Sequence, residues 1–238
     1  MTPNAKRGFM PTDERDFSEK ALPKLRKAAE EVYFLLNRGY PVTGTTRFIG
    51  DHYQLSERQR LALARIVSPK ESIISRKNRE LTDISGKTLY IDGLNVIIGL
   101  EIAYSDSMLF RCMDGTIRDL AGLHGTYRLI SQTDSAIRAL LASLETLEVE
   151  KAVIYLDQPV SNSGRLRQRI LELAGSIPFS LEVETENPVD AILKTKPLVA
   201  SADAIILDEC QQWFNLVKYV VEKQIGDYPY IEIMQDQL

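Results

Sequence analysis

Apolar residues in the first part of the chain recur at the spacing of one helical face. The apolar positions that follow this three- to four-residue spacing are Phe17, Ala21, Leu25, Ala28, Ala29, Val32, Leu35 and Leu36. This period predicts an amphipathic helix from about residue 16 to 37. Gly39 and Pro41 follow, and both residue types end helices. The chain is therefore expected to begin with a helical element.

The apolar period weakens after this helix. Residues 41–53 are polar with a few aromatic side chains and are expected to form a loop. Ser56 and Gln59 have the spacing of a capping box, which predicts a second helix that stops at Pro69. Residues 68–86 are rich in charge and poor in large apolar side chains, so they are expected to form a linker.

Beyond this linker, short apolar runs alternate with amphipathic segments. The runs that predict strands are 88–91, 151–156, 179–183, 198–200 and 204–207, with a last one at 230–233. The faces that predict helices are Ile137, Leu140, Leu141, Leu144 and Leu147, then Leu166, Ile170, Leu173 and Ala174. A final helix capped by Asp208 is expected to bury Trp213, Val217, Val220 and Val221. This alternation implies a mostly parallel sheet covered on both faces. We predict a Rossmann-like α/β domain at 87–238 after a helical element at 1–86.

Carboxylates stand at the ends of the predicted strands. Asp92 follows the first strand, Asp157 the second and Asp203 a later one, while Asp190 opens the short segment between them. Ligands of open α/β sheets bind at the carboxyl ends of the strands. Acids that converge there without partners are costly, and a cation normally holds them together. Oxygen ligands of this kind suit Mg²⁺ or Mn²⁺, so we predict a site for one of these metals.

The net charge of −4 conceals an asymmetry along the chain. Residues 1–87 hold 17 Lys and Arg against 11 Asp and Glu, a net of +6, whereas residues 88–238 hold 12 against 22, a net of −10. This asymmetry fits either a polyanion-binding element joined to a metal site or two solvated faces of opposite sign. The basic set consists of Arg47, Arg58, Arg60, Arg65, Arg76, Lys77 and Arg79, with Tyr40, Phe48 and Tyr53 as candidates for stacking on unpaired bases.

Composition disfavours two classes of protein. No apolar run approaches the roughly 20 residues that span a bilayer, and the N-terminus carries charges in place of a signal-peptide core, so a cytoplasmic address is expected. Cys112 and Cys210 lie far apart, and His52 and His124 are the two histidines of the chain, which does not favour a structural zinc site. Both cysteines are expected to be reduced thiols. The sequence indicates no oligomeric state.

The string Ile91-Asp92-Gly93-Leu94-Asn95-Val96 resembles the first motif of PIN-like and NYN-type ribonuclease domains. Residues 187–193 and 198–203 are similar to the later pair of that family, an Asp that opens a helix and a strand that ends in a Ser/Thr-x-Asp turn. The similarity covers roughly residues 87–210, and the order and spacing of the motifs carry it. The resemblance implies a Rossmann-like nuclease in which Asp92, Asp190 and Asp203 bind the metal.

Three residues compete for the remaining acid of that family. Asp157 stands at a strand end and is our choice, while Asp114 and Asp119 are alternatives. Asn95 completes the predicted catalytic group, because its amide can bond the loop or orient Asp92. The whole chain, with its helical start and the string Arg38-Gly39-Tyr40-Pro41-Val42-Thr43-Gly44, also resembles an uncharacterised prokaryotic family named only as a domain of unknown function. That resemblance implies no chemistry.

Residues suited to binding phosphate follow the second predicted strand. Ser161, Asn162 and Ser163 precede a helix that carries Arg165. Backbone amides at such a helix start, together with a guanidinium group, can hold a phosphate of the substrate. A helix cap beside a solvated basic face is the alternative. Further substrate-binding candidates are Arg118, His124 and Arg128.

These features favour a metal-dependent ribonuclease or a related phosphodiesterase acting on RNA. One alternative is a catalytically silent RNA-binding protein whose acids are helix caps. Another is a Toprim-like or other nucleotide-processing phosphotransfer enzyme, which would need an early Glu and a paired Asp-x-Asp that are not evident here. The first strand is followed by neither Gly-x-x-x-x-Gly-Lys-Ser/Thr nor Gly-x-Gly-x-x-Gly, which argues against ordinary nucleotide binders.

Overall fold

The structure is a computed structural model that describes residues 6–122 and 125–234. The chain divides into two compact units whose segments alternate along the sequence. The sheet unit comprises Arg79–Ser107 and Gly122–Tyr228, with the N-terminal residues up to Arg7. The helical unit comprises Gly8–Asn78, Met108–Ala121 and the residues from Pro229 onward. The predicted boundary at residue 86 differs from this division, because a hairpin and the C-terminal segment join the helical unit.

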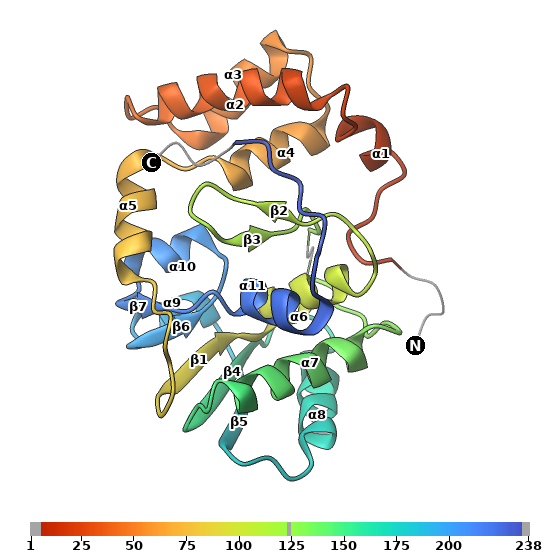
Figure 1. The fold of residues 1–238 in the computed structure, drawn as a ribbon, viewed down its shortest axis with the longest axis vertical. Coiled ribbons are helices and arrows are strands. Elements are labelled where there is room, and N and C mark those ends of the chain that lie inside the picture. The colour runs from red at the N-terminus through yellow and green to blue at the C-terminus, as the bar shows by residue number, and fades with distance from the viewer. Residues whose placement is uncertain (1–5, 123–124, 235–238) are drawn as a thin grey trace. The chain divides into compact units, whose positions relative to one another are not determined.

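The sheet unit is built on five parallel strands in the order β5-β4-β1-β6-β7 (Figure 1). The strands are β1 (Thr88–Asp92), β4 (Lys151–Asp157), β5 (Ser180–Glu186), β6 (Leu198–Ala200) and β7 (Gln212–Trp213). The helices are α6 (Gly93–Ala103), α7 (Thr133–Thr146), α8 (Ser163–Ala174), α9 (Val189–Lys194), α10 (Ala204–Glu209) and α11 (Leu216–Val220), with a π-helix at Val221–Ile225. This arrangement confirms the predicted α/β fold.

The two faces of this sheet follow from the alternation of side chains along each strand. On one face, Val153 and Tyr155 of β4 pack with Val189 and Leu193 of α9 and with the apolar side of α10. Helices α6 and α8 contact the opposite face. Because β1 lies in the middle with β4 and β6 on either side, the carboxyl ends of these three strands share one edge.

The helical unit is formed mainly by short helices. They are α1 (Asp13–Asp16), α2 (Leu22–Leu36), α3 (Val42–His52), α4 (Glu57–Ile66) and α5 (Lys70–Arg79, whose last residue belongs to the sheet unit), joined by a hairpin of β2 (Phe110–Arg111) and β3 (Ile117–Arg118). The predicted capping box is confirmed: the Ser56 hydroxyl accepts the Gln59 amide N–H, and the Gln59 side chain accepts the Ser56 N–H. The core of this unit includes Leu25, Val32, Leu63 and Ile66, all without exposed surface.

Several predicted elements are wrong, and buried polar residues explain two of them. Residues 41–53 form helix α3, whose buried face consists of Thr45, Thr46, Ile49 and Gly50 and so lacks an apolar period. The predicted linker contains helix α5, which buries Arg76. The predicted strand 204–207 is helix α10, and Asp208 lies within it without capping a later helix. Residues 230–233 form no strand of the main sheet; Ile231 makes an isolated bridge with Phe110.

None of the helices in the described ranges is both long and apolar enough to cross a membrane.

Candidate functional site

Asp92 is the last residue of β1 and the N-cap of α6. One carboxylate oxygen, Oδ1, accepts the backbone N–H of Asn95 at 3.3 Å, and Oδ2 accepts the hydroxyl of Ser201 at 2.8 Å. The residue is 7% exposed. Within the described part of the chain, the groups that bond this carboxylate are therefore neutral.

Burial raises the pKa of Asp92 to about 7. The hydrogen bonds from Ser201 and Asn95 lower it, and the neighbouring carboxylates of Asp157 and Asp203 raise it further. A carboxyl with this pKa is half protonated near neutral pH. The site therefore holds an acid whose charge is poorly stabilised by the protein itself.

The turn from β1 into α6 needs glycine for steric reasons. A Cβ atom on Gly93 would lie 2.6 Å from Cγ2 of Ile154 and 2.8 Å from the carbonyl oxygen of Tyr155. The start of α6 can thus lie directly against β4, which places Asp92 beside the end of that strand. Asn95 then joins α6 to the end of β6, because its side-chain oxygen accepts the N–H of Ala202 at 2.8 Å.

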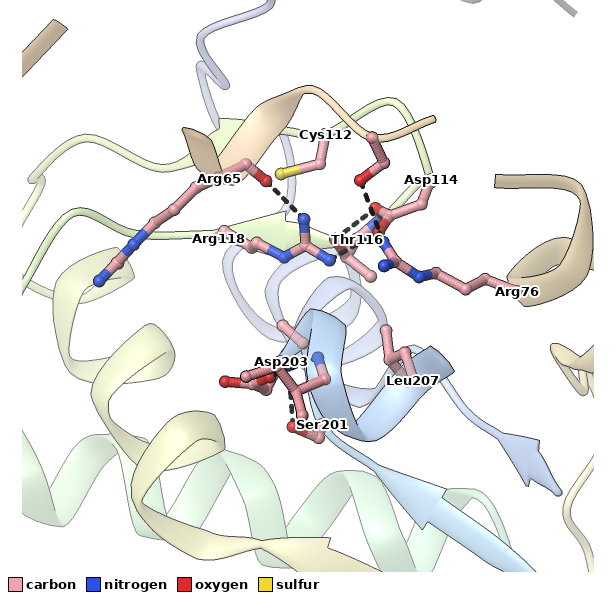
Figure 2. Close-up of polar contacts among 12 residues, drawn as sticks. Arg65, Arg76, Cys112, Asp114, Thr116, Arg118, Ser201, Asp203 and Leu207 are labelled. Atoms are coloured by element: carbon pink, nitrogen blue, oxygen red, sulfur yellow. Dashed lines mark hydrogen bonds and ion pairs between the residues drawn. The ribbon is translucent and has the colours of Figure 1, made fainter. Parts of the chain in front are cut away.

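Ser201 and Asp203 form the turn after β6 (Figure 2). The Ser201 hydroxyl oxygen accepts the backbone N–H of Asp203 at 3.0 Å while the hydroxyl donates to Asp92. Asp203 caps α10, since its Oδ1 accepts the N–H of Ile205 at 2.7 Å. The turn thereby brings two strand ends together through one hydroxyl group.

Asp157 and Asp190 belong to the same group of acids. Burial and then the charge of Asp190 raise the pKa of Asp157. Partial desolvation and then the charge of Asp203 raise the pKa of Asp190, against the smaller effect of Lys194. Each of the four predicted acids therefore has at least two of the others as electrostatic neighbours.

The predicted metal ligands are not assembled as a three-carboxylate site. Over residues 6–122 and 125–234, no three His, Cys, Asp or Glu side chains are grouped so that they could hold one ion. Asp92 and Asp203 each accept a backbone N–H as a helix cap, and Asp190 is exposed in the first turn of α9. The acids lie near one another, but the carboxylates of Asp92 and Asp203 accept hydrogen bonds from the backbone of the helices that they cap.

Glu186 is a further acid at this edge that sequence reasoning missed. It is the last residue of β5, and the register of the parallel pair places it directly beside Asp157. Its carbonyl oxygen accepts the N–H of Gln158 at 2.9 Å. The signal in the sequence was the alternation of Glu182, Glu184 and Glu186, which puts the last of them at the strand end.

The predicted phosphate-binding loop follows Asp157 and leads into α8. The Ser163 hydroxyl donates to the carbonyl oxygen of Asp157 at 2.6 Å, so it binds the backbone of the strand end. Asn162 has a left-handed backbone (φ 67°), and its amide donates to the carbonyl of Tyr127 at 2.7 Å. Ser161 and Arg165 are exposed. Two of the four predicted side chains thus have structural hydrogen bonds, and two face solvent.

The prediction that Arg118 binds substrate does not fit its surroundings. Arg118 is 8% exposed and donates to Asp114 and to the carbonyl oxygen of Arg65, within the helical unit (Figure 2). Asp114 and Asp119 are likewise paired with arginines there, whereas Asp157 interacts with Asp92. This supports Asp157 as the fourth acid of the group. Arg128 is exposed, and His124 lies outside the described residues.

Most of the predicted basic set is paired with other parts of the protein. Within the helical unit, the ion pairs are Arg58–Asp13, Arg60–Asp51, Arg65–Asp119 and Arg76–Asp114. Within the sheet unit, Arg79 donates to the carbonyl oxygens of Leu207 and Cys210. These guanidinium groups stabilise the fold, so the positive charge of residues 1–87 overstates what is available to bind a polyanion. Phe48 and Tyr40 remain exposed, at 68% and 57%.

Fold and site together define an α/β protein that carries interacting carboxylates at the carboxyl edge of a five-stranded parallel sheet. The chain belongs to the family described as Domain of unknown function (DUF5616), whose model matches residues 81–219. A second model, described as Protein of unknown function (DUF434), matches residues 24–79. The two matches meet at the end of α5. The predicted resemblance to a domain of unknown function is thereby confirmed, and neither description assigns the chain to the PIN-like nucleases.

One relative is similar to this protein over most of the chain. It is the Uncharacterized protein MJ0935 of Methanocaldococcus jannaschii, which is 38% identical over 200 residues and covers 83% of this chain and 93% of the relative. No solved structure matches the chain.

Proposed function

We propose that this protein is a Mg²⁺- or Mn²⁺-dependent ribonuclease or related phosphodiesterase acting on RNA. The observation that carries the proposal is the buried carboxylate of Asp92, which has neutral hydrogen-bond donors and two acidic neighbours in the described part of the chain. A buried carboxylate of this kind is stabilised strongly by a cation supplied from outside. A divalent ion bound by oxygen atoms fits that requirement.

The acids at this edge fit such an ion although they form no three-carboxylate cage. Mg²⁺ is commonly held by one or two carboxylates, with water and substrate phosphate oxygens as its other ligands. Asp92 with Asp203 or Asp157 would hold it. Once bound, the ion would activate a water molecule and neutralise charge that develops on a phosphate. The protein's own contribution is orientation: Ser201 and Asn95 hold the Asp92 carboxylate in place.

RNA as the substrate is supported by the resemblance of the Asp92 motif to PIN-like domains and by the loop after Asp157. Ser161 and Arg165 are exposed there, so a backbone phosphate can reach them. A cytoplasmic address fits an enzyme that acts on RNA and belongs to the same proposal.

A second candidate function is a catalytically silent RNA-binding protein. The observation that favours it is the capping role of the acids, because Asp92 and Asp203 each accept a backbone N–H at a helix start. In that protein the carboxylates stabilise α6 and α10 and take no part in chemistry.

Replacement of Asp92 tests the choice between these functions. Asp92→Asn keeps the shape and removes the charge, so Mn²⁺-dependent cleavage of single-stranded RNA should fall by about 100-fold or more, as expected for loss of a metal ligand. The assay compares Mg²⁺, Mn²⁺ and EDTA. The matched control is Asp106→Asn, which makes the same change at an exposed position beyond the other end of α6. Asp106 has a positive φ that Asn tolerates, so this control should fold and cleave normally.

One result would decide against the enzyme, and another against the assigned site. Purified wild-type protein that binds RNA but cleaves none with either metal supports the silent-binding function. If Asp92→Asn cleaves as well as wild type, Asp92 is only a cap. The folding check is the fluorescence of Trp213, the single tryptophan, which is fully buried in the sheet unit.

A further inference from the structure

Glu101 is a buried carboxylate of the sheet unit that the proposed site does not use. It lies on α6 with no exposed surface. Its Oε1 accepts the Tyr127 hydroxyl at 2.6 Å and the Thr133 hydroxyl. Its Oε2 lies 2.5 Å from Nε of Arg7, in an ion pair whose two side chains are 0% and 13% exposed. A residue near the N-terminus therefore neutralises a carboxylate in the interior of the unit.

Arg7 also contacts the segment 125–128. It donates to the carbonyl oxygen of Arg128, and its guanidinium carbon lies 4.7 Å from the centre of the Tyr127 ring. A guanidinium group between a carboxylate and an aromatic face is a favourable arrangement for a cation. Burial raises the pKa of Glu101, and Arg7 is the strongest of the groups that lower it. Arg7 thus holds this segment against α6 through Tyr127.

The same segment holds the loop that follows Asp157. The N–H of Ser161 donates to the carbonyl oxygen of Gly125 at 3.1 Å, and Thr126 and Ser161 form an isolated parallel bridge. The Asn162 amide donates to the carbonyl oxygen of Tyr127 at 2.7 Å. Asn162 makes no side-chain capping bond to α8, so its side chain is bonded to segment 125–128, while the Ser163 hydroxyl bonds the carbonyl oxygens of Asp157 and Val160.

A continuous series of polar contacts therefore joins Arg7, near the N-terminus, to the site. It runs from Arg7 and Glu101 to Tyr127, from Tyr127 to Asn162, and from Ser163 to the carbonyl oxygen of Asp157. Every residue in it belongs to the sheet unit.

We propose that Arg7 and Glu101 are positioning residues that hold the loop Ser161–Ser163 in the place where it receives a substrate phosphate. This inference rests on the proposed function for the identity of the ligand, but the positioning itself is a property of the free protein. It gives Arg7 a role in the site through Tyr127, although Arg7 touches no substrate.

Amide hydrogen exchange on the full-length protein tests the positioning without any substrate. Arg7→Gln should speed exchange of the Ser161 amide and of the amides of segment 125–128 by about tenfold or more, while the β4 amides stay unchanged. Asn162→Gly removes the side-chain link and suits the positive φ, so it should loosen the loop but not the ion pair. Arg7→Lys should give an intermediate result, because Lys restores the charge but not the planar fork. Lys6→Gln is the charge-matched control at the adjacent exposed position.

The outcomes separate this inference from the proposed function. Unchanged exchange at Ser161 in Arg7→Gln overturns the positioning role, and so does an equal acceleration of the β4 amides, which would make Arg7 a general stabiliser. If wild type cleaves RNA, Arg7→Gln should raise KM by about tenfold with kcat little changed, because the acids are untouched. If wild type cleaves no RNA, the exchange result still decides the positioning role.

Discussion

Asp114 of the helical unit and Asp92 of the sheet unit are both buried carboxylates, and they differ in the charge of their partners. Asp114 lies 2.6 Å from a guanidinium nitrogen of Arg76 and 2.6 Å from one of Arg118 (Figure 2). Asp92 accepts hydrogen bonds from Ser201 and from the backbone of Asn95, both neutral. The first carboxylate has its compensating charges within the protein, and the second has acids as neighbours.

The pKa values follow from this difference. Burial raises the pKa of Asp114, but Arg118, Thr116 and Arg76 together outweigh burial and leave the pKa below its ordinary value. Burial dominates at Asp92 and raises the pKa to about 7. A buried acid with its own cations is a structural residue, whereas a buried acid without them is a candidate for chemistry or for binding a cation. Substitutions at these two carboxylates and at their hydroxyl partners test whether this contrast is real.

The largest effect is expected from Asp114→Asn. It leaves two buried guanidinium groups without their carboxylate, which should lower the free energy of unfolding of the helical unit by about 3–5 kcal/mol at pH 7. The measurement is urea denaturation followed by hydrogen exchange of the α4 amides. Asp51→Asn is the matched control, since Asp51 pairs with Arg60 but its side chain is 65% exposed, and it should cost less than about 1 kcal/mol.

The stability of Asp114→Asn relative to wild type should also depend on pH, which gives a second test of the Asp114 ion pairs. A lowered folded pKa means that Asp114 stabilises the fold above its ordinary pKa and loses this contribution as the pH falls through the lowered value. The difference between wild type and Asp114→Asn should therefore shrink in strong acid. A difference that stays constant from pH 7 down to pH 2 would contradict the pairing.

Asp92→Asn is expected to act in the opposite direction. The folded wild type keeps a proton on Asp92 up to about pH 7, while the unfolded chain releases it near its ordinary value of about 3.9, so wild type loses stability as the pH rises between these values. In EDTA at pH 8 the Asn variant should be more stable by up to about 4 kcal/mol, with little gain at pH 4. Denaturation monitored by Trp213 fluorescence measures this difference in stability. If the Asn variant were less stable than wild type at pH 8, Asp92 would not differ from Asp114 in the way described.

The smallest effect is expected from removal of the hydroxyl that bonds Asp92. The Ser201 hydroxyl favours the charged form of the carboxylate, so Ser201→Ala should move the pKa of Asp92 upward from about 7. The corresponding change in the helical unit, Thr116→Val, should raise the pKa of Asp114 toward its ordinary value. Carboxyl carbon NMR titration measures both. A downward shift at Asp92 would show that Ser201 does not donate to it.

The helices and strands that could be predicted from the sequence are those whose buried faces consist of apolar residues. Strand β4 is buried on both faces, β1 is buried on one face and half-buried on the other, both appear as apolar runs, and α7 has a wide apolar face. Helices α3 and α5 could not be found this way, because their buried faces include Thr45, Gly50 and Arg76. Arg76 is compatible with burial because Asp114, 38 residues away, supplies its charge.

The candidate site divides in the same way. Most of the acids of the site could be predicted, because they directly follow apolar runs in the sequence. The parallel arrangement of the strands could be predicted from their alternation with helices. The order β5-β4-β1-β6-β7 was not visible, and it is this order that makes Glu186 a neighbour of Asp157. In the sequence, Arg118 was a candidate for binding substrate, and Asp114 was an alternative fourth acid of the site. In the structure the two residues form an ion pair with each other.

The sequence by itself determined that this protein is α/β, that its acids stand at strand ends and that a capped helical element precedes them, because these features depend on local periodicity and turn chemistry. Only the tertiary structure decided which charges are already compensated. Asp114 has two arginines and Asp92 has none in the described part of the chain, and Arg7 reaches Glu101 across 94 positions of sequence. Charge compensation depends on distances between side chains that folding brings together, so linear spacing does not reveal it.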